Sequence, residues 1–197
     1  MRLIRTTGRG SRLAQETIAA LAQRGHHALD RVTPAVRRIV TAVRKRGDRA
    51  LFRYAAQFDS LADADALRVK QEEMAAAWDG LDPALRNAIS TASEQIRGFA
   101  ERQLPRSWTH SPLPGLTTGQ LVRPLGSVGC YVPSGRHPLP STLLMTAIPA
   151  QVAGVARIVV VSPNPAPATL AAAHLLGIAE FYRVGGAHAI EMQQRVA

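Results

Sequence analysis

The sequence has a single cysteine, Cys130, among its 197 residues, and it has no long apolar run. One cysteine excludes an internal disulfide and is typical of proteins in a reducing compartment. No stretch approaches the length that a membrane helix requires. The basic start is followed by polar, glycine-containing residues 6–12, where a leader peptide would be apolar. We therefore expect a cytoplasmic protein without a membrane segment.

Acidic residues are also scarce, with 14 Asp and Glu against 24 Lys and Arg. The densest basic run, residues 37–49, alternates with apolar residues at the helix period, which is typical of a solvated helix face opposite a buried stripe. No aromatic residue interleaves this run, and neither zinc-finger spacing nor a helix-turn-helix pattern occurs. The net charge of +10 keeps nucleic-acid binding open as a hypothesis, but we expect no nucleic-acid partner.

The length and the 46% hydrophobic content predict a globular chain that can bury a core. We divide it into a mostly helical N-terminal region, 1–120, and an α/β domain, 121–197. Helices are expected over residues 11–22, 33–46, 48–58, 71–78 and 82–103, and the histidine pair at 26–27 is expected in an exposed loop. Four prolines and glycines between residues 104 and 118 predict no regular element there.

The α/β domain is organised around residues 122–154. The run 128–132 is short and β-prone, which predicts a buried strand, and residues 133–138 predict a tight loop. A helix is expected from Pro140, because proline suits the first helical turn. Further strands at 157–161 and 181–184, with helices at 167–176 and 187–196, complete the pattern β-α-β-α-β-α. The fold class is therefore α/β, with an incomplete Rossmann-like, doubly wound parallel sheet, and residues 120–125 are expected to form an edge strand.

These residues resemble a known family. Residues 122–163 read VRPLGSVGCYVPSGRHPLPSTLLMTAIPAQVAGVARIVVVSP, and residues 184–190 read VGGAHAI. Together with VRKRGDRAL at 43–51 and YAAQFD at 54–59, they are similar to histidinol dehydrogenase, the last enzyme of histidine biosynthesis. The resemblance implies a homodimeric, zinc-dependent enzyme that oxidises L-histidinol to L-histidine in two NAD-dependent steps.

The same resemblance implies which residues meet the cofactor. Tyr131 would lie in the NAD site, position 188 would be a second contact, and Gly135 would belong to the loop beside the cofactor. His188 stands where the family has glutamine, and Ser134 stands in place of a glycine, at a cost of about 1 kcal/mol if that position needs a positive φ. Arg136 and His137 replace small side chains. They either contact phosphate groups or belong to a loop that has diverged without gaining a function. We expect weakened or lost NAD affinity.

The family's zinc ligands and general acid/base pair lie in a part that this sequence does not match. The six histidines show no ligand spacing, so an exposed or hydrogen-bonded role is expected for each. No acid–histidine pair stands out as a base. We expect neither catalytic nor metal-binding residues in this chain.

A sheet of three or four strands leaves an open edge, which predicts a homodimer or a partner that supplies the second half. The polar residues 191–195 predict an exposed final helix. Three hypotheses follow: a truncated histidinol dehydrogenase homologue that is inactive without the zinc half, a non-catalytic dimerisation or regulatory protein derived from that family, and a basic nucleic-acid binder. Salt-sensitive retention on DNA or RNA would support the third.

Overall fold

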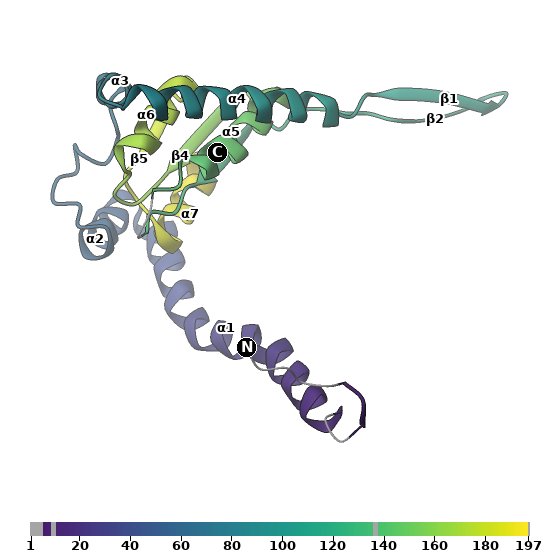
Figure 1. Cartoon of the computed structure of the whole chain (residues 1–197), viewed down its shortest axis with the longest axis horizontal. Helices are drawn as coiled ribbons and strands as arrows, with labels where there is room; N and C mark the ends of the chain where they lie inside the picture. The colour runs from purple at the N-terminus through teal and green to yellow at the C-terminus, as the bar shows by residue number, and fades with distance from the viewer. Residues whose placement is uncertain (1–5, 9–10, 136–137, 197) are drawn as a thin grey trace.

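A three-stranded parallel sheet forms the centre of the molecule (Figure 1). The computed structural model describes residues 6–8, 11–135 and 138–196, with the side chains of 22–28, 195 and 196 left out. Strands β3 (Ser127–Tyr131), β4 (Arg157–Val161) and β5 (Glu180–Tyr182) lie in the order β3-β4-β5. The register pairs Cys130 with Val160, and Val160 with Phe181. The sequence also predicts a short strand at residues 67–70, where Arg68 forms an isolated antiparallel bridge with Tyr182 of β5.

Helices cover both faces of this sheet, which confirms the predicted α/β architecture. One core lies beneath α5 (Pro140–Val152) and α6 (Pro167–Leu175), with α3 (Gln71–Asp79) and α4 (Pro83–Gln103) packed outside them. The other face carries α7 (Gly186–Val196) and α2 (Asp48–Phe58), whose Leu51 and Ala55 pack in a cluster with Val161. The helix-period spacing of Leu51, Tyr54 and Phe58 predicts that Phe58 lies in the core; in the structure it is 53% exposed.

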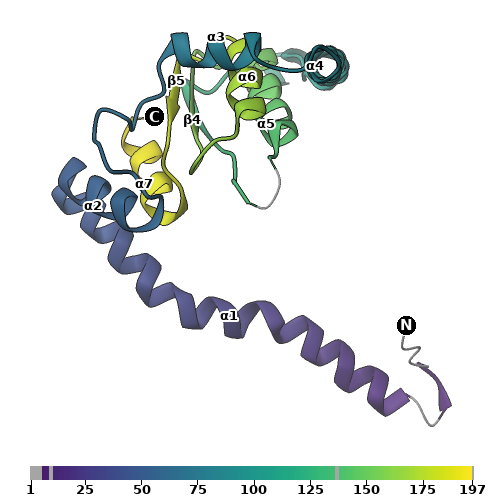
Figure 2. The ribbon, with the colours of Figure 1, turned by 60° about the vertical axis from the view of Figure 1, so that its left-hand side comes forward.

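Two segments extend away from the sheet (Figures 1 and 2). Helix α1 (Ser11–Arg46) is continuous, so the two helices predicted over 11–22 and 33–46 are one, and the histidine pair at 26–27 lies within it and not in a loop. An interior proline removes one backbone hydrogen bond and either kinks or breaks the helix, so it does not always end one. Pro34 lies inside α1, and the prediction gave too much weight to it and to Gly25.

The second extension is a hairpin of β1 (Trp108–Leu113) and β2 (Leu116–Gln120), where we expected no regular element. Pro112 falls where the register shifts between His110 and Leu113, so its missing N–H interrupts no regular ladder. Gly115 turns the chain at φ 81°. The edge strand expected over 120–125 is absent, because β2 ends at Gln120 and residues 121–126 are irregular. Within the described chain no helix has both the length and the apolar character needed to cross a membrane.

The final helix is not the exposed polar ending that its composition predicts. Glu191 and Gln193 are buried, at 3% and 5% exposure. The Glu191 carboxylate accepts two hydrogen bonds from Arg44 of α1, at 2.9 and 3.0 Å. The Gln193 amide donates to the carbonyls of Cys130 and Val159, at 3.3 and 3.1 Å. Glu191 therefore attaches α7 to α1, and Gln193 attaches it to β3 and β4.

Candidate functional site

The carboxyl end of β3 is where a ligand is expected in a doubly wound sheet. Tyr131 is the last residue of β3 and is partly buried. Its ring packs against the cluster that contains Leu51, Val161 and Ala189. Ala189, the residue after His188, belongs to this cluster, so Tyr131 and the start of α7 pack against the same residues. Strand β4 lies between β3, which ends at Tyr131, and β5, which precedes α7. The structure thus brings two of the three predicted cofactor residues to one end of the sheet.

The third predicted residue, Gly135, lies in the loop between β3 and α5. It is exposed, and a methyl group added there would meet no atom within 4 Å. Ser134 does not have a positive φ, so the strain considered for that position does not arise. Arg136 and His137 lie outside the described residues. The loop therefore leaves open space beside it, and its contact with a cofactor stays a prediction.

His188 is buried in the first turns of α7, with 2% exposure. Its Nε2 lies 2.8 Å from Oδ2 of Asp59, which also accepts the backbone N–H of Gly185 at 3.1 Å. The rings of Tyr54 and Phe58 lie 6.0 and 5.9 Å from the imidazole. One nitrogen of His188 is already engaged, so Nδ1 is the atom left for any other partner.

The Asp59–His188 pair is the functional candidate that sequence reasoning missed. The two residues are 129 positions apart, and no spacing rule connects them. The available signal was that both lie in stretches that resemble the same family, YAAQFD and VGGAHAI. In the structure Asp59 orients the imidazole and fixes the turn at Gly185 between β5 and α7. Because both side chains are buried, the pair positions α7 and does not itself face a substrate.

An ion pair between Arg157 and Glu180 joins β4 to β5 near the opposite, amino-terminal end of β4. Arg157 donates to both oxygens of Glu180, at 2.6 and 2.8 Å. The hydrogen bond from Arg157 is the main cause that holds the pKa of Glu180 below its ordinary value. Burial, followed by the charge of Glu180, raises the pKa of Tyr182. The Arg157–Glu180 pair joins β4 to β5, and the Tyr182 hydroxyl donates to Glu180 at 3.2 Å while its ring packs against the same cluster as Tyr131.

The described residues do not suit zinc. A structural or catalytic zinc ion needs three or four converging ligands. Across the described residues no three His, Cys, Asp or Glu side chains come together in a way that could hold a metal ion. His110 lies on the hairpin, His174 is exposed on α6 and His188 is bonded to Asp59. Cys130 is buried, and burial raises the pKa of its thiol.

Comparisons with known proteins give a consistent result. The sequence model described as histidinol dehydrogenase matches residues 22–193. The histidinol dehydrogenase of Methanothermobacter thermautotrophicus is 42% identical over 178 residues, which are 88% of this chain and 42% of that protein. The one from Thermosynechococcus vestitus is 46% identical over 161 residues, 79% of this chain and 37% of that protein.

A solved structure agrees with these matches. The crystal structure of histidinol dehydrogenase from Elizabethkingia anophelis superposes with a TM-score of 0.74 at 32% identity, covering 81% of this chain and 38% of that one. The chain thus spans about two fifths of the length of the relatives that it matches.

Proposed function

The chain belongs to the histidinol dehydrogenase family, and we propose that it forms the NAD side of a histidinol-oxidising enzyme whose zinc half is supplied by another polypeptide segment. The observation that carries this proposal is the match over residues 22–193 combined with the absence of a metal cluster from the described part of the chain. Without the zinc half, the chain is inactive.

The residues at the carboxyl end of the sheet suit a dinucleotide. Tyr131 would contact NAD, the open space beside Gly135 would admit it, and the α7 turn that contains His188 would border it. NAD, when bound, would accept hydride from an alcohol substrate. The protein's own contribution is positional: Asp59 holds His188 and Gly185, and this fixes the α7 end of the site. Burial of the imidazole, where the family resemblance expects an amide, supports weakened NAD affinity.

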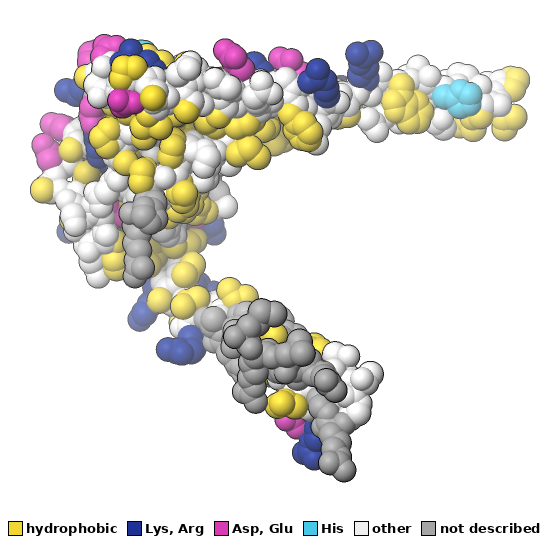
Figure 3. Space-filling model, in the orientation of Figure 1, with side chains coloured by type: hydrophobic (Ala, Val, Ile, Leu, Met, Phe, Trp, Pro, Cys, Tyr) yellow, Lys and Arg dark blue, Asp and Glu magenta, His cyan; other side chains and the backbone are white. Residues whose placement is uncertain are grey.

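Exposed apolar side chains support an obligatory partner. Helix α1 and the β1–β2 hairpin both carry them, and Figure 3 shows them as yellow surface on these two extensions. The residues include Ile18, Leu29, Trp108 and Leu113, at 59%, 60%, 54% and 64% exposure. Patches of this kind mark interaction surfaces. We propose a homodimer or a complex with the second half, in the cytoplasm, where a lone buried thiol stays reduced.

Calorimetric titration with NAD tests the cofactor part of this proposal. We expect saturable binding that Tyr131→Ala abolishes. The matched control is Phe99→Ala, which removes an aromatic side chain that is 64% exposed on α4 and should leave binding unchanged. Circular dichroism would establish that each variant is folded. Absence of binding at millimolar NAD would overturn the cofactor role.

A second function is favoured by the same exposed apolar extensions. A non-catalytic dimerisation or regulatory protein would need them and would need neither NAD nor zinc. Analytical ultracentrifugation with a full-length histidinol dehydrogenase distinguishes the two: a stable hetero-complex formed by a chain that does not bind NAD supports the regulatory role.

A further inference from the structure

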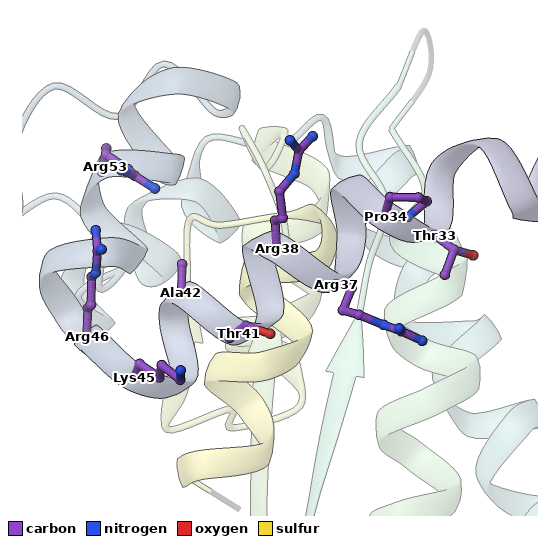
Figure 4. Close-up of a pocket in the computed structure, with 9 residues that line it drawn as sticks. All are labelled: Thr33, Pro34, Arg37, Arg38, Thr41, Ala42, Lys45, Arg46 and Arg53. Carbon is purple, nitrogen blue, oxygen red and sulfur yellow. The ribbon is translucent and has the colours of Figure 1, made fainter.

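Two adjoining hollows lie where α1 meets α2. Figure 4 shows the residues that line the first of them. The first has a volume of about 800 Å³ and is lined mainly by the C-terminal half of α1. The second has a volume of about 670 Å³ and is lined by the last residue of α1 and the first half of α2. Arg46 and Arg53 line both hollows, so the two form one continuous surface, which we call the α1–α2 groove.

The charge of the α1–α2 groove has one sign. Its cationic side chains are Arg37, Arg38, Lys45, Arg46, Arg49 and Arg53, and no acidic side chain lines either hollow. Asp48, the acidic residue between them in sequence, lines neither. Among the described residues, none of the six cations forms an ion pair. Arg53 lies over the ring of Tyr54, 4.5 Å from the ring centroid, which is the one cation–π contact that the six make among the described residues. Because no carboxylate offsets the six like charges, an anionic ligand would relieve their mutual repulsion.

Buried residues of α1 and α2 hold the α1–α2 groove in place. Val43, Ala50 and Leu51 are at most 3% exposed and hold the two helices against the body. Arg44, the one arginine of this run that faces α7, forms the bidentate pair with Glu191. Arg44 thus has a carboxylate partner on α7, whereas the cations of the groove form no ion pair within the described residues. Ordering the groove on binding therefore requires side-chain movement only.

The side chains of the groove define the ligand class. Five of the six cations are arginines, whose fork of N–H groups matches phosphate oxygens. The cations on α1 lie within residues 37–46, ten residues whose ends are about 14 Å apart along a helix. No aromatic side chain lines the hollows, so bases have no stacking platform, and the volumes fall within the range of about 300–1,000 Å³ typical of small-molecule sites. These features favour a compact ligand recognised through its charges.

We propose that the α1–α2 groove binds a small anion that carries several phosphate groups. Recognition is through the phosphates, and the rest of the ligand extends into solvent. The site is separate from the predicted NAD site, since Tyr131, Gly135 and His188 line neither hollow. A bound anion neutralises positive charge at the C-terminal end of α1, which favours the packing of this helix against α2 and α7.

Inorganic tripolyphosphate is the probe, measured by calorimetric titration at low and high salt. The groove variant combines Arg38→Gln, Arg46→Gln and Arg53→Gln. The matched control combines Arg31→Gln, Arg106→Gln and Arg123→Gln, which are exposed, lie outside both hollows and change the net charge by the same amount. We expect saturable binding that weakens with salt, at least tenfold in the groove variant and less than twofold in the control.

Three results would overturn the proposal. No binding of tripolyphosphate removes the site, and an equal loss in both variants means that binding depends on net charge alone. Tight, groove-dependent binding of a single-stranded or duplex oligonucleotide, with no binding of tripolyphosphate, would assign the groove to nucleic acid. Circular dichroism before titration separates a loss of binding from a loss of fold.

Discussion

Replacing Asp59 tests whether the buried acid–histidine pair fixes α7. The carboxylate is 7% exposed, and it accepts hydrogen bonds from the His188 ring and from the N–H of Gly185. Asp59→Ala removes the acceptor of both bonds. Two buried donors are then left without their acceptor.

The magnitude follows from these two donors. An unsatisfied buried polar group costs about 1–3 kcal/mol, so two of them cost about 2–6 kcal/mol. Loss of the carboxylate also removes its own desolvation cost, which places the expected net loss near the lower half, about 3 kcal/mol. Against a typical stability of about 5–15 kcal/mol, this is a large fraction. His188→Gln keeps an amide donor toward Asp59 and is expected to cost about 1 kcal/mol or less.

Equilibrium urea denaturation followed by circular dichroism measures these losses. Asp65→Ala is the matched control, because Asp65 is an exposed carboxylate and its side chain forms no ion pair within the described chain. In the double variant Asp59→Ala, His188→Ala the two losses should not add, because the residues share one bond. If Asp59→Ala is as stable as the Asp65→Ala control, the buried pair does not fix α7 and the reasoning is refuted.

Three further predictions concern the sheet. Gly129→Ala should destabilise the chain by about 1–3 kcal/mol, because its methyl group would lie 2.7 Å from the glutamine side chain of α7 that packs over it, whereas Gly126→Ala meets no atom within 4 Å and should be neutral in the same urea titration. Cys130 should react slowly with iodoacetamide in the folded protein and rapidly in urea, because burial raises its pKa and shields the sulfur; equal rates would show that β3 is accessible. The pKa of Glu180 is lowered by Arg157, so its stabilising contribution is present above the ordinary value of 4.5 and is lost as the pH falls through the lowered value; Glu180→Gln should flatten this acid dependence, and an unchanged pH profile of stability would contradict it.

Local signals in the sequence were sufficient for most of the α/β part. The β-prone runs at 128–132 and 157–161 became β3 and β4, because buried parallel strands need little more than an apolar run bounded by loops. Asp82 before Pro83 predicted the start of α4, and its carboxylate does accept from the backbone N–H of Ala84 and Leu85. These features depend on residues within a few positions of one another.

The errors arose where distant residues decide the outcome. Glu191 and Gln193 look like exposed polar residues until Arg44 and the strand carbonyls are placed beside them. The Asp59–His188 pair is likewise invisible to spacing rules. Turn chemistry explains the missed hairpin, since Pro112 and Gly115 are compatible with strands at a bulge and at a tight turn.

The most direct test of the central claim is histidinol-dependent NAD reduction by the chain alone and after mixing with the complementary C-terminal segment of the Methanothermobacter thermautotrophicus relative, each supplied with zinc. We predict no NADH from the chain alone and NADH production by the mixture, lost on Tyr131→Ala. Turnover by the chain alone would contradict the account, because it would require a metal and proton-transfer site within these 197 residues. A zinc-loaded complex that forms but does not bind NAD would contradict the assignment of this chain to the cofactor side.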